Sequence, residues 1–136
     1  MIDETMQTML MDRAVEARER SYSPYSHYAV GAALLTADGE IYLGCNIENA
    51  SYTPTICAER TAFFKAVFDG VRDFTAIAVI GSGETPGFPC GVCRQVMAEF
   101  CKDDFVIISA NRDRSIVVTE TLADMLPHSF GPRDLL

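Results

Sequence analysis

The sequence predicts a mixed α/β fold in which helices pack against a five-stranded mixed sheet. Some segments carry apolar residues at helical spacing, and others are short apolar runs of the kind that form strands. Along the chain they follow the order helix, hairpin, helix, strand, helix, strand, strand, which is typical of one layered domain. A length of 136 residues with 49% hydrophobic content supports a single domain over 1–136.

The first part of the chain is expected to hold one helix and a β-hairpin. Residues 3–20 form the predicted helix, and Ser23-Pro24 interrupts the helical pattern. The apolar stripe of this helix is Met6, Met9, Leu10, Ala14 and Ala17. Residues 30–36 and 40–46 are strand-like, and Ala37-Asp38-Gly39 between them is a good hairpin turn. These two strands are therefore expected to pair antiparallel.

The rest of the chain alternates between helices and strands. The predicted elements are helices over 56–69 and 91–102, strands over 74–80, 105–109 and 116–119, and a short helical turn over 121–125. The expected apolar stripes are Phe63, Ala66 and Val67 in the first of these helices, and Val92, Val96 and Phe100 in the second. Segment 74–80 is apolar almost throughout, which is typical of a strand covered on both faces.

Two segments with cysteines stand at the starts of the second and third helices. They are Cys57-Ala58-Glu59-Arg60 and Pro89-Cys90-Gly91-Val92-Cys93. Cys57 and Glu59 point about 200° apart on a helix, so they can act on one group only at the helix tip. Three thiolates at two helix N-termini can hold zinc and leave its fourth tetrahedral position for a water beside an acid/base group. The pattern predicts a hydrolytic zinc site.

Other interpretations of the cysteines remain open at this point. A single Cys-x-x-Cys pair is also typical of a thioredoxin-like redox centre or of half a structural zinc site. His27 and His128 lack ligand-like spacing to this pair, so a closed four-ligand site is hard to assemble. Cys45 and Cys101 lie in apolar surroundings and are interpreted as small core residues. We expect no disulfides, which fits a reducing compartment.

The charge of the chain bears on its partner. Eleven basic residues stand against 19 acidic ones, giving a formal net charge of −8. Nucleic acid is normally bound by a basic surface, so the balance favours an uncharged small substrate, although acidity also fits a role in solubility alone. The longest apolar run, 29–35, is too short to span a bilayer, and the acidic N-terminus does not look like a secretory signal. A soluble cytoplasmic protein without a membrane partner is expected.

Four segments together resemble the small three-cysteine class of cytidine deaminases, and they occur in the order found in that family. The segments are 24–34, 44–50, 57–62 and 89–95. The last two contain the general zinc deaminase signature, a His or Cys followed by x-Glu and later by Pro-Cys-x-x-Cys. The resemblance implies a three-layer α/β/α fold, one zinc ion per chain on Cys57, Cys90 and Cys93, and Glu59 as the catalytic acid and base.

The resemblance also implies a reaction and an assembly. The reaction is hydrolytic deamination of cytidine and 2′-deoxycytidine to uridine and 2′-deoxyuridine with release of ammonia, in pyrimidine salvage, and the assembly is a homotetramer. Arg60 matches the family arginine that hydrogen-bonds the ligand sulfurs, and Arg94 is a second possible donor. The backbone N–H of Ala58 is expected to bind the base, and the carbonyl of Phe88 to contact the leaving amine. Phe130 is expected to close the pocket of a neighbouring subunit.

Three further residues are candidates for substrate binding. Asn46 and Glu48 point the same way in an extended chain, and an amide beside a carboxylate suits sugar hydroxyls as well as it suits a solvated turn. In the family, the residues that match them bind the ribose. Tyr28 stands where the family usually has a phenylalanine lining the base pocket. The added hydroxyl needs a polar partner or water.

Alternative functions share parts of this pattern. A deaminase of another small aminated pyrimidine, such as blasticidin S, would use the same zinc chemistry, but Asn46 and Glu48 favour a nucleoside. A polynucleotide editor would need a basic groove, which the charge balance disfavours. A non-enzymatic zinc-binding interaction module is the alternative from a different class. Glu59 beside the cysteines argues against it.

Overall fold

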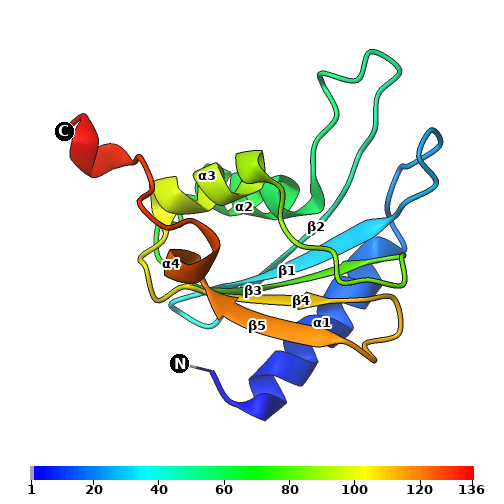
Figure 1. Cartoon of the computed structure of the whole chain (residues 1–136), viewed down its shortest axis with the longest axis horizontal. Coiled ribbons are helices and arrows are strands. Elements are labelled where there is room, and N and C mark those ends of the chain that lie inside the picture. The colour runs from blue at the N-terminus through cyan, green and yellow to red at the C-terminus, as the bar shows by residue number, and fades with distance from the viewer. Residues whose placement is uncertain (1) are drawn as a thin grey trace.

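The computed structural model of the chain describes residues 2–136 and confirms the predicted five-stranded mixed sheet (Figure 1). The strands are β1 (Val30–Thr36), β2 (Ile41–Cys45), β3 (Phe74–Gly81), β4 (Val106–Ala110) and β5 (Val117–Thr121). They lie in the order β2-β1-β3-β4-β5. β3 and β4 are parallel, and the other neighbours are antiparallel. β3 is therefore the central strand of the sheet.

Helices cover both faces of the sheet, as the three-layer prediction requires (Figure 1). The helical elements are α1 (Glu4–Arg18), α2 (Ala58–Phe68), α3 (Gly91–Phe100), α4 (Leu122–Met125) and a 3-10 turn (Pro132–Asp134). Leu10 of α1 lies in the buried cluster on one face, whereas Phe63 of α2 and Met97 of α3 lie in the cluster on the other. Within residues 2–136, no helix is long and apolar enough to cross a membrane.

Two residues predicted to be in the core are on the surface. Met9 of α1 is 39% exposed, and Val92 of α3 is 58% exposed. On α3 the buried residues are Cys93 and Met97, which are four positions apart and share a helix face. Because each residue turns the helix by about 100°, placing Cys93 inside rotates its neighbour Val92 out to solvent.

Two glycines allow helices to approach the sheet closely, one on each face. A Cβ built on Gly31 of β1 would lie 2.8 Å from Cα of Arg18 in α1 and closer still to the carbonyl oxygen of Ala14. A Cβ on Gly44 of β2 would lie 2.6 Å from the backbone N of Ala62 in α2. Because these contacts are with helix backbone, no side-chain rotation can relieve them.

Gly31→Ala is therefore expected to lower the free energy of unfolding by about 1–3 kcal/mol, the usual cost of overpacking a core. Chemical denaturation of the purified protein measures the effect. Gly131→Ala is the matched control, since a Cβ there meets its nearest atom, the carbonyl oxygen of Ala98, at an ordinary 3.7 Å. Equal stability of the two variants would contradict the close approach of α1.

Candidate active site

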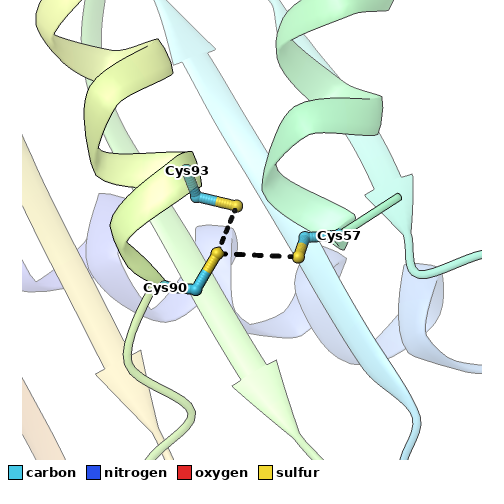
Figure 2. Close-up of side chains that lie close together, drawn as sticks. All are labelled: Cys57, Cys90 and Cys93. Atoms are coloured by element: carbon cyan, nitrogen blue, oxygen red, sulfur yellow. Dashed lines mark hydrogen bonds between the residues drawn. The ribbon is translucent and has the colours of Figure 1, made fainter. Parts of the chain in front are cut away.

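Two helix starts converge at one point above the sheet and bring three cysteines together (Figure 2). Cys57 is the N-cap of α2 and Cys90 the N-cap of α3, and neither side chain caps its own helix. Cys93 lies in the first turn of α3 and is buried. The backbone pair between Ile47 and Ile56, with both N···O distances 3.0 Å, closes the loop that leads into Cys57. The thiols are thus free to turn toward one another.

The sulfur geometry fits a tetrahedral zinc ion. Sγ of Cys90 lies 3.8 Å from Sγ of Cys57 and 3.5 Å from Sγ of Cys93. Zn–S bonds of about 2.3 Å at tetrahedral angles place sulfurs about 3.8 Å apart. These three thiols are the only group of three or more His, Cys, Asp or Glu side chains within residues 2–136 that could hold a metal ion. A structural zinc site normally has four protein ligands, so this set leaves one position open.

The Cys57 thiol ionises readily in this cluster. Hydrogen bonding with the Cys93 thiol, followed by the effect of the Arg60 guanidinium, lowers the pKa of Cys57 to about 5. Nη2 of Arg60 donates to Sγ of Cys57 at 3.3 Å. The pKa of Cys93 is raised by its hydrogen bond with Cys57 and then by burial, because its proton is shared with that thiolate. A divalent cation would take the place of such protons.

Glu59 is the buried carboxylate beside the cluster. It lies in the first turn of α2, one residue beyond the helix start, and is only 4% exposed. Burial is the main cause that raises its pKa to about 7, and the neighbouring Cys57 thiolate adds to the rise. A carboxyl group with a pKa close to neutral can both accept and donate a proton at physiological pH. The position at the helix tip is the one that the spacing of Cys57 and Glu59 requires.

A cavity of about 200 Å³ joins the cluster to the other predicted residues. Its lining includes Tyr28, Asn46, Cys57, Ala58, Glu59, Phe88 and Cys90. A second cavity of about 400 Å³ is lined by Glu48 together with Tyr25, Ser26, Asn49 and Tyr52. Thr55 lines both cavities, so they adjoin. Phe130 lines neither cavity and is 59% exposed on the C-terminal segment.

Asn46 ties down both ends of the loop before β1. Its Oδ1 accepts hydrogen bonds from the backbone N of Val30, at 2.9 Å, and from the hydroxyl of Ser21. Its Nδ2 donates to the carbonyl oxygen of Tyr28 at 2.8 Å. One N–H of the amide has no partner among residues 2–136, and that hydrogen remains available for a ligand.

Glu48 holds the middle of the same loop. Its Oε1 accepts hydrogen bonds from the backbone N of Tyr25 at 3.0 Å and of Ser26 at 3.1 Å. Its Oε2 accepts from the Ser26 hydroxyl, which is the main cause that lowers the pKa of the carboxyl group. The side chain is therefore an ionised acceptor, and Oε2 still has an unused lone pair.

The sequence did not reveal every residue of the site. Thr55, which joins the two cavities, and Ser26, which fixes Glu48, lie in loops without a periodic signal. Arg94 does not contact the sulfurs. Its Nε donates to the carbonyl of Pro89 and its Nη1 to that of Met125, both at 2.8 Å, so it fastens the start of α3 to α4. The sequence does not predict which carbonyl groups a guanidinium contacts, because Pro89 and Met125 come close to Arg94 only in the folded protein.

Comparison with known proteins agrees with the geometry. The family model described as the cytidine and deoxycytidylate deaminase zinc-binding region matches residues 4–109. The chain is 54% identical to a cytidine deaminase of Sporosarcina psychrophila, over 93% of this chain and 92% of that protein. It is 50% identical to a cytidine deaminase of Halalkalibacterium halodurans, over 93% and 96%. The crystal structure of cytidine deaminase from Burkholderia pseudomallei superposes with a TM-score of 0.87 at 46% identity, covering 90% of this chain and 98% of that one.

Removal of zinc is expected to make Cys57 and Cys90 reactive toward a chromogenic disulfide reagent, because metal coordination consumes the thiolates that would react. Burial raises the pKa values of Cys45 and Cys101, so these two thiols should react slowly with and without metal. Absorbance of the released chromophore counts the fast thiols before and after chelation. Cys101→Ser should leave the count gained on chelation unchanged, whereas Cys90→Ser should lower it. An equal count before and after chelation of zinc-loaded protein would contradict this site.

Proposed function

The chain belongs to the cytidine and deoxycytidylate deaminase family, and from this membership we propose that it hydrolyses cytidine and 2′-deoxycytidine to uridine and 2′-deoxyuridine with release of ammonia. The observation that carries the proposal is the position of Glu59. This buried carboxylate lines the same cavity as Cys57 and Cys90, beside a cluster whose sulfur spacing suits zinc. A metal-binding module without catalytic activity would not require a buried carboxylic acid beside the metal ligands.

The proposed chemistry divides between the metal and Glu59. Zinc held by Cys57, Cys90 and Cys93 would supply Lewis-acid activation of a water molecule at neutral pH. Glu59 would take a proton from the water that attacks C4 and deliver it to ring N3. It would then carry the second proton of that water to the exocyclic amine, which leaves as ammonia. The raised pKa of Glu59 suits a group that must both accept and donate.

Backbone groups at the two helix starts are proposed to orient the base. Ala58 is the first residue of α2, so its N–H has no acceptor within the helix, and the residue is fully buried while lining the cavity. This N–H is assigned the role of a donor to the base. Phe88 also lines the cavity, two residues before the N-cap of α3, and its carbonyl is assigned to the leaving amine. The ring of Tyr28 forms an apolar wall.

Asn46 and Glu48 are proposed to bind the sugar where the two cavities adjoin. Asn46 lines the cavity beside the cysteines, called the inner cavity from here on, and has one N–H still available. Glu48 lines the second cavity, called the outer cavity, and is an ionised acceptor. A sugar hydroxyl can accept from the amide of Asn46, and a hydroxyl can donate to the carboxylate of Glu48. A base beside Glu59 and a sugar near Thr55 would together occupy both cavities.

The lining of the two cavities favours a nucleoside over a nucleotide. Within residues 2–136, the side chains that line them include the carboxylates of Glu48 and Glu59 but no Lys or Arg. Phosphate binding in proteins relies on basic side chains or free backbone N–H groups, and the N–H of Ala58 is assigned to the base. A phosphate on the sugar would lie near the Glu48 carboxylate and be repelled.

The remaining assignments extend beyond the cavity. Arg60 is assigned the role of offsetting the net negative charge of three thiolates on one zinc ion, and its 3.3 Å contact with Cys57 supports this role.

We further propose a homotetramer in which Phe130 completes the pocket of a neighbouring subunit. The exposed position of Phe130, outside the cavity of its own chain, supports this assignment. Action in pyrimidine salvage in the cytoplasm is the expected setting for this chemistry.

Glu59→Gln is expected to reduce kcat/KM for cytidine by about 10²–10⁴-fold with zinc retained, because the amide cannot carry protons. The loss of ultraviolet absorbance as cytidine becomes uridine measures turnover, and zinc is quantified in the same samples. Glu99→Gln is the matched control, since Glu99 is exposed on α3. Loss of zinc from the Glu59 variant would instead favour a structural metal site. Full activity would exclude Glu59 as the proton carrier.

The enzyme is expected to deaminate 2′-deoxycytidine with a kcat/KM at least about a hundredfold higher than that for its 5′-monophosphate, because of the repulsion from Glu48. Both substrates are followed by the same absorbance change, at low and at high salt. High salt should narrow the gap, since it screens exposed charges. Equal kcat/KM values at low salt would contradict the preference for a nucleoside.

A further inference from the structure

Tyr28 rests in a recess formed by three glycines. A Cβ built on Gly81 would lie 2.6 Å from Cζ of Tyr28 and closer still to its hydroxyl oxygen, and its three nearest atoms all belong to Tyr28. A Cβ on Gly83 would lie 3.2 Å from Cε1 of the ring, and one on Gly87 would lie 3.1 Å from the hydroxyl oxygen. The ring end therefore occupies the space that a side chain at position 81 would need.

The backbone of Gly81 is held in place from two sides. Gly81 ends β3 and pairs with Val30 of β1. Its carbonyl oxygen accepts a hydrogen bond from Nη1 of Arg18 at 3.0 Å. The next residue, Ser82, accepts a hydrogen bond at Oγ from the backbone N of Ala29 at 2.9 Å. A side chain added at Gly81 would thus have to move the tyrosine rather than the strand.

The backbone of Tyr28 is equally fixed. Its carbonyl oxygen accepts from Nδ2 of Asn46 at 2.8 Å, and its N–H donates to Oγ of Ser26 at 3.0 Å. The ring can therefore respond only by rotating about its side-chain bonds. Strand residues two apart face the same way, so Gly81 faces the same side as Val79, which lines the inner cavity. Tyr28 itself lines that cavity, so a ring displaced from Gly81 changes the space left there for a ligand.

We propose that Gly81 is a positioning residue for the deamination: its missing side chain seats the ring of Tyr28 against the sheet and so keeps the cavity open for the base. The inference rests on the proposed function only in naming the ligand that the open cavity receives. The recess also explains how a tyrosine fits at position 28, because its hydroxyl extends over Gly81 instead of into the cavity.

The test compares Gly81→Ala, Gly83→Ala, Tyr28→Phe and the double variant Tyr28→Phe with Gly81→Ala, all loaded with zinc. We expect Gly81→Ala to raise KM for cytidine by about tenfold, because a displaced ring obstructs the bound base. Zinc content should stay unchanged. Gly83→Ala should have a much smaller effect, since its closest contact with the ring is 3.2 Å. The double variant should recover part of the loss, because removing the hydroxyl leaves Cζ at 2.6 Å as the nearest atom.

A second measurement needs no substrate. In protein labelled with fluorotyrosine, the ¹⁹F resonance of Tyr28, assigned by its loss in Tyr28→Phe, should shift in Gly81→Ala and stay nearly in place in Gly83→Ala. An unshifted resonance, or a wild-type KM in Gly81→Ala, would overturn the inference. A shifted resonance in a protein whose wild type does not deaminate cytidine would support the seating of Tyr28 and refute the proposed function instead.

Folding failure is also informative. If Gly81→Ala does not fold, the double variant of Gly81→Ala with Tyr28→Ala should fold, because the nearest atoms to the new methyl group all belong to the Tyr28 ring and hydroxyl. Its thermal unfolding is compared with that of Tyr28→Ala alone. Similar melting temperatures would support the inference, and a double variant that stays unfolded would overturn it.

Discussion

The site depends on the convergence of two helix N-termini to within sulfur contact distance. Zinc–sulfur bonds are short and directional, so Cys57 on one helix and Cys90 on the other must stay within tenths of an ångström of their places. Neither helix sets this distance by itself. Both helices pack on the same face of the sheet (Figure 1). There Phe63 of α2 and Met97 of α3 share one buried cluster, which fixes each helix in place. The absence of a side chain at Gly44 lets α2 settle close enough.

The same convergence sets part of the charge balance around the cysteines. The free N–H groups of two helix starts and the guanidinium of Arg60 all face a cluster that would otherwise concentrate negative charge. Burial is the main cause that raises the pKa of the Glu59 carboxyl beside that cluster, and the negative charge of the Cys57 thiolate adds to the rise. The packing that buries Glu59 in the first turn of α2 thus produces an acid that can release and regain its proton near pH 7.

The fold was largely predictable from the sequence because its elements obey local rules. Apolar periodicity located all five strands and the three long helices to within two residues at each end, and the spacing of Cys57, Cys90 and Cys93 predicted the group that could hold a metal ion. Failures came where tertiary contact decides. Val92 is a good core residue by type, but the demand that Cys93 face the cluster turned it outward. The contacts of Arg94 and the role of Thr55 depend on chain segments that meet only in three dimensions.

Asn46 and Glu48 have more than one duty in this structure. Both side chains fasten the loop that carries Tyr28, Asn46 through the carbonyl of Tyr28 and Glu48 through Ser26. If they also bind the sugar, the sugar site and the base site of a nucleoside depend on the same loop. A substitution at either position would then change both the sugar contact and the support of the loop that carries Tyr28. A change of sugar preference would therefore be expected to require compensating substitutions elsewhere in the loop.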